Sequence, residues 1–313
     1  MNRPVEHPDR DGAAAAVHAT PLPSAPGPED WRALARSAPW RWTTLDATIT
    51  THPSPADRAP AGLPSTVRLR GQRGAETAHV ETLDGNVLQE GPRHAPADRW
   101  ANRHNGRSVL FLVGASLTGD EERDLRAEHD RKELAELDHP PRRADGLIAE
   151  RPGVFGPPDP PSWHNYSYVA LLDPAELADG RYDADRDEGH QPGDDATPQD
   201  GDVVPGVRVW NVRAHEVGGR PVWTARVLPT RHYQPRCGCC ALIMTAAVAR
   251  EEWGAERAAD LGWGAPEHPA DPHPDPAYAE VSLDVASGVV ARLRIVGGRE
   301  DGSGYDVDIV RAD

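Results

Sequence analysis

The stretch AEVSLDVASGVVARLRI, residues 279–295, decides the fold because its apolar side chains recur at every second position. Such alternation is typical of a β-strand with one buried face and one solvated face. It covers residues 279–285, stops at the turn Ser287-Gly288 and resumes over residues 291–295. Residues 305–309 repeat it shortly afterwards. The end of the chain therefore predicts three strands of a sheet that has one dry face and one charged face.

Further strands and a few helices are predicted upstream. Residues 207–212 and 222–228 flank a Gly218-Gly219 turn, as in a β-hairpin. The other strands are expected at residues 66–70 and near residues 41–50, 76–83, 86–90, 107–114 and 166–172. Helices are expected over residues 28–37, which begin with proline and two acids, and over residues 118–137 and 241–252. The predicted fold class is mainly β, with an antiparallel sheet and a few helices.

Composition divides the chain into a tail, one domain and an acidic loop. Residues 1–27 are rich in proline and alanine and have no hydrophobic period, so we expect a disordered tail. Residues 28–313 are expected to form a single domain, a length that one β-rich domain can have. Within it, residues 173–202 contain eleven acids and two arginines, which predicts an acidic, solvated loop.

The charge balance excludes some partners. The chain has 34 basic and 50 acidic residues, a formal net charge of -16. Such a chain repels phosphate backbones, so we expect no nucleic-acid partner. No stretch approaches the roughly 20 apolar residues of a membrane span, and residues 1–28 lack the hydrophobic core of a secretory signal. We therefore expect a cytoplasmic protein without a transmembrane segment. Lys132 is the only lysine beside abundant arginine, alanine, glycine and proline, which is typical of a GC-rich bacterial genome.

All three cysteines, Cys237, Cys239 and Cys240, lie in one stretch of four residues, with His232 shortly before it. Thiolates are soft metal ligands and nucleophiles, and in a reducing cytosol a thiol cluster favours a metal or redox site over a structural disulfide. With His232 as the fourth ligand the set would suit zinc, although three thiols so close together need a tight loop to reach one ion. The alternative is that the cysteines are buried small side chains without a chemical role.

Tryptophan is unusually frequent, with nine residues against two phenylalanines. Trp42, Trp100, Trp210 and Trp223 fall in predicted strands or beside them, where large rings would line a groove for an apolar ligand. The alternative is that these rings fill the core.

One pattern in the last third resembles a known family. The segment Glu216-Val217-Gly218-Gly219-Arg220-Pro221-Val222-Trp223, with the following strand to Pro229 and the stretch from Val281 to Val290, resembles the signature of bacterial lipoprotein-carrier proteins, also called outer-membrane lipoprotein-sorting proteins. The resemblance implies an incomplete antiparallel β-barrel wrapped over helices, whose concave apolar surface receives lipid or acyl chains. The Cys-x-Cys-Cys cluster is not part of the family pattern.

These observations favour binding over catalysis. The patterns Gly-x-Ser-x-Gly and His-Glu-x-x-His and the phosphate-binding loop do not occur in the sequence. We expect a non-enzymatic module that binds an apolar, lipid-like ligand or a protein partner. The alternative is a thiol-dependent protein that binds metal or senses redox state through Cys237, Cys239 and Cys240.

Overall fold

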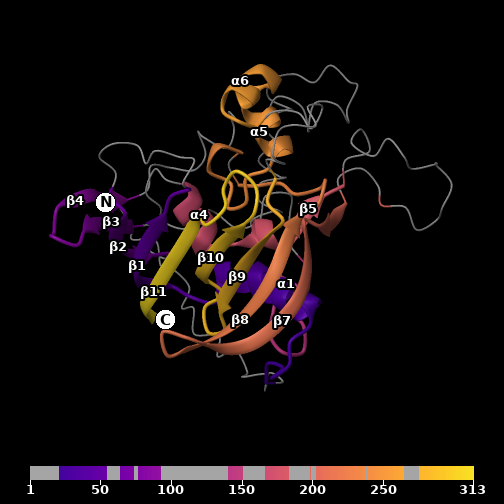
Figure 1. Cartoon of the computed structure of the whole chain (residues 1–313). Coiled ribbons are helices and arrows are strands. Elements are labelled where there is room, and N and C mark those ends of the chain that lie inside the picture. The colour runs from indigo at the N-terminus through magenta and orange to yellow at the C-terminus, as the bar shows by residue number, and fades with distance from the viewer. Residues whose placement is uncertain are drawn as a thin grey trace, which may run out of the picture.

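The computed structural model describes residues 21–54, 64–73, 77–92, 140–150, 166–182, 198, 202–236, 238–263 and 275–313. Within these residues nine strands form one antiparallel sheet, in the order β4-β3-β2-β1-β11-β10-β9-β8-β7 (Figure 1). The strands are β1 Thr44–His52, β2 Thr66–Gln72, β3 Thr77–Thr82, β4 Val87–Pro92, β7 Val207–Val217, β8 Arg220–Pro229, β9 Tyr278–Asp284, β10 Val290–Val296 and β11 Gly304–Ala312.

The sheet curves but does not close. β4 and β7 are its two edges, and they do not pair with each other in the described part of the chain. The resulting incomplete antiparallel barrel confirms the predicted fold class. The strands predicted near residues 41–50, 66–70, 76–83, 86–90, 207–212, 222–228, 279–285, 291–295 and 305–309 are all present.

Two helices lie on the concave side of the sheet (Figure 1). Helix α1, Pro28–Ser37, confirms the predicted helix; Gly27 is its N-cap, and its backbone N–H donates to the Asp30 carboxylate at 2.8 Å. The Trp31 side chain of this helix is fully buried, and its Nε1 donates to the carbonyl oxygen of Trp223 on β8 at 3.1 Å. Helix α4, Tyr166–Leu172, lies on the same side of the sheet. Side chains from both helices and from the inner face of the sheet form one continuous core.

Two predictions about the middle of the chain are wrong. Residues 166–172 form helix α4 rather than a strand, because a short run that is apolar throughout has no period to separate a buried helix from a buried strand. Residues 173–182 are not part of a solvated loop: they form the short helix η2, Ala175–Leu177, and strand β5, Asp179–Arg181, which pairs with β6, Val203–Pro205. Residues 183–197 of the predicted acidic loop lie outside the described residues.

The acids of this segment are buried because each has a specific partner. Asp173 pairs with Arg73, Glu176 accepts a hydrogen bond from Tyr233, and Asp179 pairs with Arg36. Burial of a charge is tolerated when such partners replace water. An acidic composition alone therefore does not show that residues 173–182 form a solvated loop.

Helices α5, Ala246–Trp253, and α6, Ala255–Asp260, form a small hairpin beyond the ends of the strands (Figure 1, top). The predicted helix over residues 241–252 begins later than expected, at Ala246, because the Thr245 side chain caps it by accepting from Val248 N. Residues 238–240 form the short helix η4, and residues 38–40 form η1. The predicted strand 107–114, the predicted helix 118–137 and most of the predicted tail 1–27 lie outside the described residues. None of the described helices has the length and apolar character needed to cross a membrane.

Candidate functional site

The predicted tryptophan groove is not assembled by the described residues. Trp42 and Trp223 are buried in the core, and the guanidinium of Arg73 lies 3.7 Å from the centre of the Trp42 ring. Trp210 lies on the opposite, outer face of the sheet, because it is paired with the outward-facing Arg226. Trp100 lies outside the described residues. Trp42 and Trp223 therefore fill the core, and Trp210 is half-buried on the other face of the sheet.

The predicted thiol site is described only in part. His232 is half-buried, and its ring lies 5.3 Å from that of Tyr182, centre to centre. Cys240 is half-buried, and its carbonyl oxygen accepts from Ser167 Oγ at 3.1 Å. Cys237 and the side chain of Cys239 lie outside the described residues. Among the side chains that are described, no group of three histidines, cysteines or acids is placed to hold a metal ion. The zinc or redox site stays a prediction.

Residues 233–243, here called the cysteine loop, are anchored at both ends by one buried carboxylate. Glu176 Oε1 accepts from Tyr233 Oη at 2.5 Å and from Leu242 N at 3.0 Å. Glu176 Oε2 accepts from Arg236 N at 2.9 Å. Burial raises the pKa of Glu176 above its ordinary value, although these hydrogen bonds act in the opposite direction. Burial also raises the pKa of Tyr233 well above its ordinary value, with the Glu176 charge adding to the shift. The loop that contains all three cysteines is therefore held in one conformation at its two ends.

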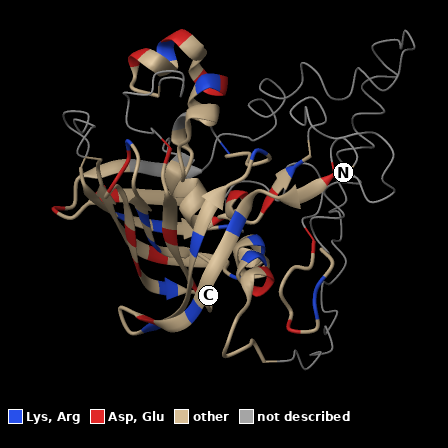
Figure 2. Ribbon diagram, turned by 45° about the vertical axis from the view of Figure 1, so that its right-hand side comes forward, with Lys and Arg blue, Asp and Glu red and all other residues tan. Residues whose placement is uncertain are grey.

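The outer face of β7–β10 combines arginines with aromatic rings, and we call it the arginine–aromatic face. Its members share the outward-facing positions of the cross-strand register. They are Arg208, Trp210, Arg213, Arg226, Tyr278, Arg292 and Arg294. One row runs across the strands through the direct pairs Trp210 with Arg226, Arg226 with Glu280, and Glu280 with Arg294. The positions of charged residues along successive strands are visible as blue and red bands on the ribbon in Figure 2.

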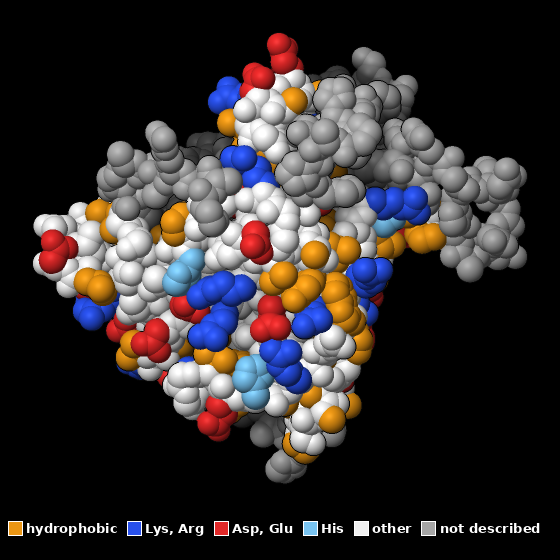
Figure 3. All heavy atoms as spheres, in the orientation of Figure 1, with side chains coloured by type: hydrophobic (Ala, Val, Ile, Leu, Met, Phe, Trp, Pro, Cys, Tyr) orange, Lys and Arg blue, Asp and Glu red, His pale blue; other side chains and the backbone are white. Residues whose placement is uncertain are grey.

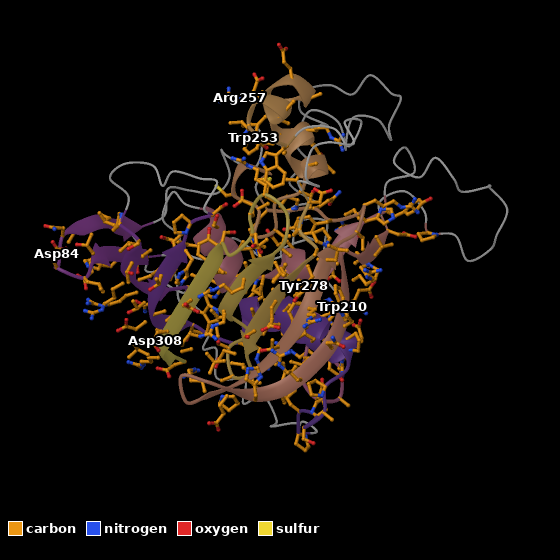
Figure 4. The ribbon with its side chains drawn as sticks, viewed as in Figure 1. Asp84, Trp210, Trp253, Arg257, Tyr278 and Asp308 are labelled. Carbon is orange, nitrogen blue, oxygen red and sulfur yellow. The ribbon has the colours of Figure 1, made fainter. Side chains whose placement is uncertain are left out.

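Guanidinium groups lie over the two half-buried rings, Trp210 and Tyr278. The Arg208 guanidinium carbon lies 5.2 Å from the centre of the Trp210 ring, and that of Arg226 lies 4.6 Å from the centre of the Tyr278 ring. The two rings meet edge to face, with centres 6.2 Å apart, as their neighbouring positions in Figure 4 indicate. Arg226 Nε is buried and has no hydrogen-bond partner among the described residues. Arg226 is partly desolvated in this way, which strengthens its attraction for an anionic group, whereas Arg208 is exposed.

Positive charge exceeds negative charge on this face. Of the carboxylates among the five arginines, Glu280 pairs with Arg213 at 3.0 Å, and Asp306 pairs with Arg292 at 2.9 Å and Arg294 at 2.5 Å. Burial opposes the shift, but the hydrogen bonds from these two arginines hold the pKa of Asp306 below its ordinary value. Figure 3 shows arginines gathered over the middle of the sheet beside a hydrophobic patch. The part of the surface that the structure describes thus includes a locally positive face, although the formal net charge of the chain is -16.

The arginine–aromatic face was not predicted from the sequence, although part of its signal was present. Arg226, Arg292 and Arg294 occupy polar positions of strands whose alternation is plain in the sequence. These residues form one face, however, only because β9 lies between β8 and β10 in the sheet. The sequence of a single strand does not specify which strands lie beside it. A bulge between Trp210 and Arg213, with Asn211 at φ 53°, also changes which side chains of β7 face outward.

A scan against protein-family models finds no family that matches this chain, and a search of curated proteins finds no match either.

Proposed function

We propose that the protein is a non-enzymatic binding module that recognises an acidic surface of a protein partner through its arginine–aromatic face. The observation that carries this proposal is the row of stacked cations and rings on β7–β9, built from Arg208, Trp210, Arg226 and Tyr278. Tryptophan, tyrosine and arginine are the residues that dominate binding energy at protein interfaces. Their concentration on one sheet face favours this face over the rest of the described surface.

The charge of the whole chain favours a protein partner over a nucleic acid. An extended polyanion would meet the acidic remainder of a chain whose net charge is -16. A folded partner with a local acidic patch meets only the arginine–aromatic face, since charges beyond about 8–10 Å are largely screened at physiological salt. The expected contacts are hydrogen-bonded pairs between carboxylates and the guanidinium groups.

The relationship to lipoprotein-carrier proteins also remains a proposal. The open sheet with α1 and α4 on its concave side is the arrangement that the resemblance implies. An apolar ligand would then enter the concave side, whereas the protein partner proposed here meets the outer face. Mutations distinguish these two modes of binding, because they should weaken binding on the concave side in the first mode and on the outer face in the second.

Binding of fluorescein-labelled deca-glutamate, followed by fluorescence anisotropy, tests the proposal. We expect saturable binding that weakens as salt is raised, and a loss of at least tenfold in the double variant R226A/R294A. Arg68→Ala is the matched control, because Arg68 is an exposed arginine of the same sheet that pairs with Glu81 on β2 and β3, away from this face. Equal loss in the control variant, or tighter binding of a ten-nucleotide single-stranded DNA than of deca-glutamate, would contradict the proposal. So would binding of a fluorescent fatty acid that excludes deca-glutamate.

The anchored cysteine loop favours one alternative, a thiol-dependent metal-binding or redox-sensing protein. Glu176 fixes the two ends of the segment that contains Cys237, Cys239 and Cys240, and a fixed loop is what three close thiols need to act on one ion or on one another. Native mass spectrometry tests it. A zinc mass increment that disappears in Cys239→Ser supports the alternative, and a metal-free mass with thiols that do not react contradicts it.

A further inference from the structure

Strand β7 forms one edge of the sheet, and the second half of this strand is exposed on both of its faces. Among the described residues β7 pairs with β8 alone, and it lies at the margin of the sheet in Figure 1. Residues 213–216 are all exposed. Proline and lysine, which commonly protect a sheet edge, do not occur in β7, and the bulge lies before this segment, whose register with β8 is regular. We call residues 213–217 the β7 edge.

The register shows which backbone groups of the β7 edge face outward. In an antiparallel sheet the N–H and C=O groups of successive residues point alternately to one neighbour and to the other. Val285 N donates to the carbonyl oxygen of Pro221 at 2.9 Å, so the Pro221 backbone faces the β9 side of its strand. Glu216 lies opposite Pro221, and its own backbone groups therefore face the free side, as do those of Ala214. The described residues form no backbone hydrogen bond on that side, which leaves these groups available to another strand.

The two faces of the β7 edge differ in charge. Arg213 contacts Glu280 at 3.0 Å and thus lies on the arginine–aromatic face. Ala214 lies opposite the core residue Trp223, so Ala214 and Glu216 lie on the other face. An added strand would alternate its side chains between the same two faces. Its acids would meet arginines on one face and the Glu216 carboxylate on the other, so only every second residue of such a strand should be acidic.

We propose that the β7 edge binds an extended acidic segment of a protein partner as an additional strand, with acids at every second position. The inference rests on the proposed function and specifies the conformation and sequence pattern of the partner. Main-chain hydrogen bonds to Ala214 and Glu216 hold the segment, and its acids lie beside the arginine–aromatic face. Charge complementarity favours this occupant over a second copy of the chain, because a second copy would bring its own Arg213 to the same edge.

Fluorescence anisotropy with fluorescein-labelled heptapeptides tests the proposal. The probe Glu-Val-Glu-Thr-Glu-Val-Glu alternates acids with β-branched residues, and its isomer Glu-Glu-Glu-Glu-Val-Thr-Val has the same composition without alternation. We expect the alternating peptide to bind at least about tenfold more tightly than the isomer. In antiparallel addition its valine nitrogens face β7 and its internal glutamate nitrogens face away. Methylation of the two valine nitrogens should therefore weaken binding at least about tenfold, and methylation of the two internal glutamate nitrogens should leave it nearly unchanged. In parallel addition the two sets exchange roles, so a loss confined to either set supports strand addition.

A proline on the protein tests the same contact from the other side. Ala214→Pro removes an edge-facing N–H but retains every arginine of the face, and it should weaken binding of the alternating peptide at least about tenfold. Leu83→Pro is the matched control at the opposite edge of the sheet. Leu83 is an exposed residue in a turn that is closed by Gly85 N donating to Thr82 O, a position that suits proline. Its affinity should equal that of the unaltered chain. Circular dichroism confirms that each variant is folded, and Glu216→Pro replaces Ala214→Pro if the latter does not fold.

The outcomes separate this inference from the proposed function. Equal effects of the two methylated sets, equal binding of the alternating peptide and its isomer, or an unchanged affinity in folded Ala214→Pro would each overturn strand addition, while salt-dependent binding of deca-glutamate would still support the proposed function. A dimer of the unaltered chain in analytical ultracentrifugation that Ala214→Pro dissociates would also overturn it, because a second copy would then occupy the edge. Absence of binding by both deca-glutamate and the alternating peptide would contradict both proposals.

Discussion

Arg36 on helix α1 and Asp179 on strand β5 form a buried, bidentate ion pair, with Nε to Oδ2 at 2.7 Å and Nη2 to Oδ1 at 2.8 Å. Arg36 Nη1 also donates to the carbonyl oxygens of Ile148 at 3.2 Å and Ala149 at 2.9 Å. One side chain thus joins three segments that are far apart in the sequence. Burial by itself would lower the pKa of Arg36, but the hydrogen bonds to Asp179 and the Asp179 charge together raise the pKa above its ordinary value.

We predict that Arg36→Ala lowers the free energy of unfolding by about 3–5 kcal/mol, because it leaves the buried Asp179 charge unpaired. Arg36→Lys should recover only part of the loss, since lysine cannot make the bidentate contact. Urea unfolding followed by tryptophan fluorescence measures the change. Arg32→Ala is the control: Arg32 pairs with the exposed Glu29, and its loss should cost less than about 1 kcal/mol. Similar losses for Arg36→Ala and Arg32→Ala would contradict the prediction.

A second prediction concerns the contact between β5 and His232, the residue just before the cysteine loop. A Cβ added to Gly180 would lie 1.8 Å from the carbonyl oxygen of His232, a distance that forces the backbone apart. Gly180→Ala should therefore destabilise the protein by more than the roughly 1–3 kcal/mol of ordinary overpacking. Gly27→Ala is the control, because its added Cβ meets nothing closer than 3.6 Å. Thermal unfolding of the two variants gives the comparison, and equal melting temperatures would refute it.

The difference between the predicted and the observed fold follows from what local patterns contain. Alternation assigned the inner and outer faces of β9 and β10 correctly, because a period of two is a property of each strand alone. Helix α4 was missed because its short apolar run has no period that separates a helix from a strand. The buried acids were missed because their contacts are distant: Asp179 meets Arg36 across 143 positions, and Glu176 meets Tyr233 across 57. In the same way, Trp210 and Trp223 were grouped by residue type, whereas the sheet places them on opposite faces.

A third prediction separates binding from stability on the arginine–aromatic face. Arg292 and Arg294 both contact Asp306, and their side chains are 48% and 28% exposed. Exposed ion pairs contribute about 0–1 kcal/mol, so Arg292→Ala and Arg294→Ala should each change the free energy of unfolding by less than about 1 kcal/mol. Each should nevertheless weaken deca-glutamate binding several-fold. A variant that loses stability in proportion to binding would show that these arginines act on the fold rather than on a partner.

The last prediction uses the pH dependence of Glu176. Its pKa in the folded protein is raised by burial, so the folded state binds a proton more readily than the unfolded state. The Glu176 contribution to stability is therefore greatest below its ordinary pKa of about 4.3 and falls as the pH rises through the interval up to the raised value. Glu176→Gln removes this dependence. It also turns an amide N–H toward Arg236 N, which should cost about 1–3 kcal/mol.

We expect the stability of the unaltered chain relative to Glu176→Gln to increase as the pH is lowered from 7 to 5, measured by urea unfolding. Arg32→Ala should leave that slope unchanged. The opposite result is a difference in the free energy of unfolding between the two proteins that stays constant, or becomes smaller, as the pH is lowered. It would show that Glu176 stays ionised when buried, because the hydrogen bonds from Tyr233 and the two backbone donors outweigh the cost of desolvation.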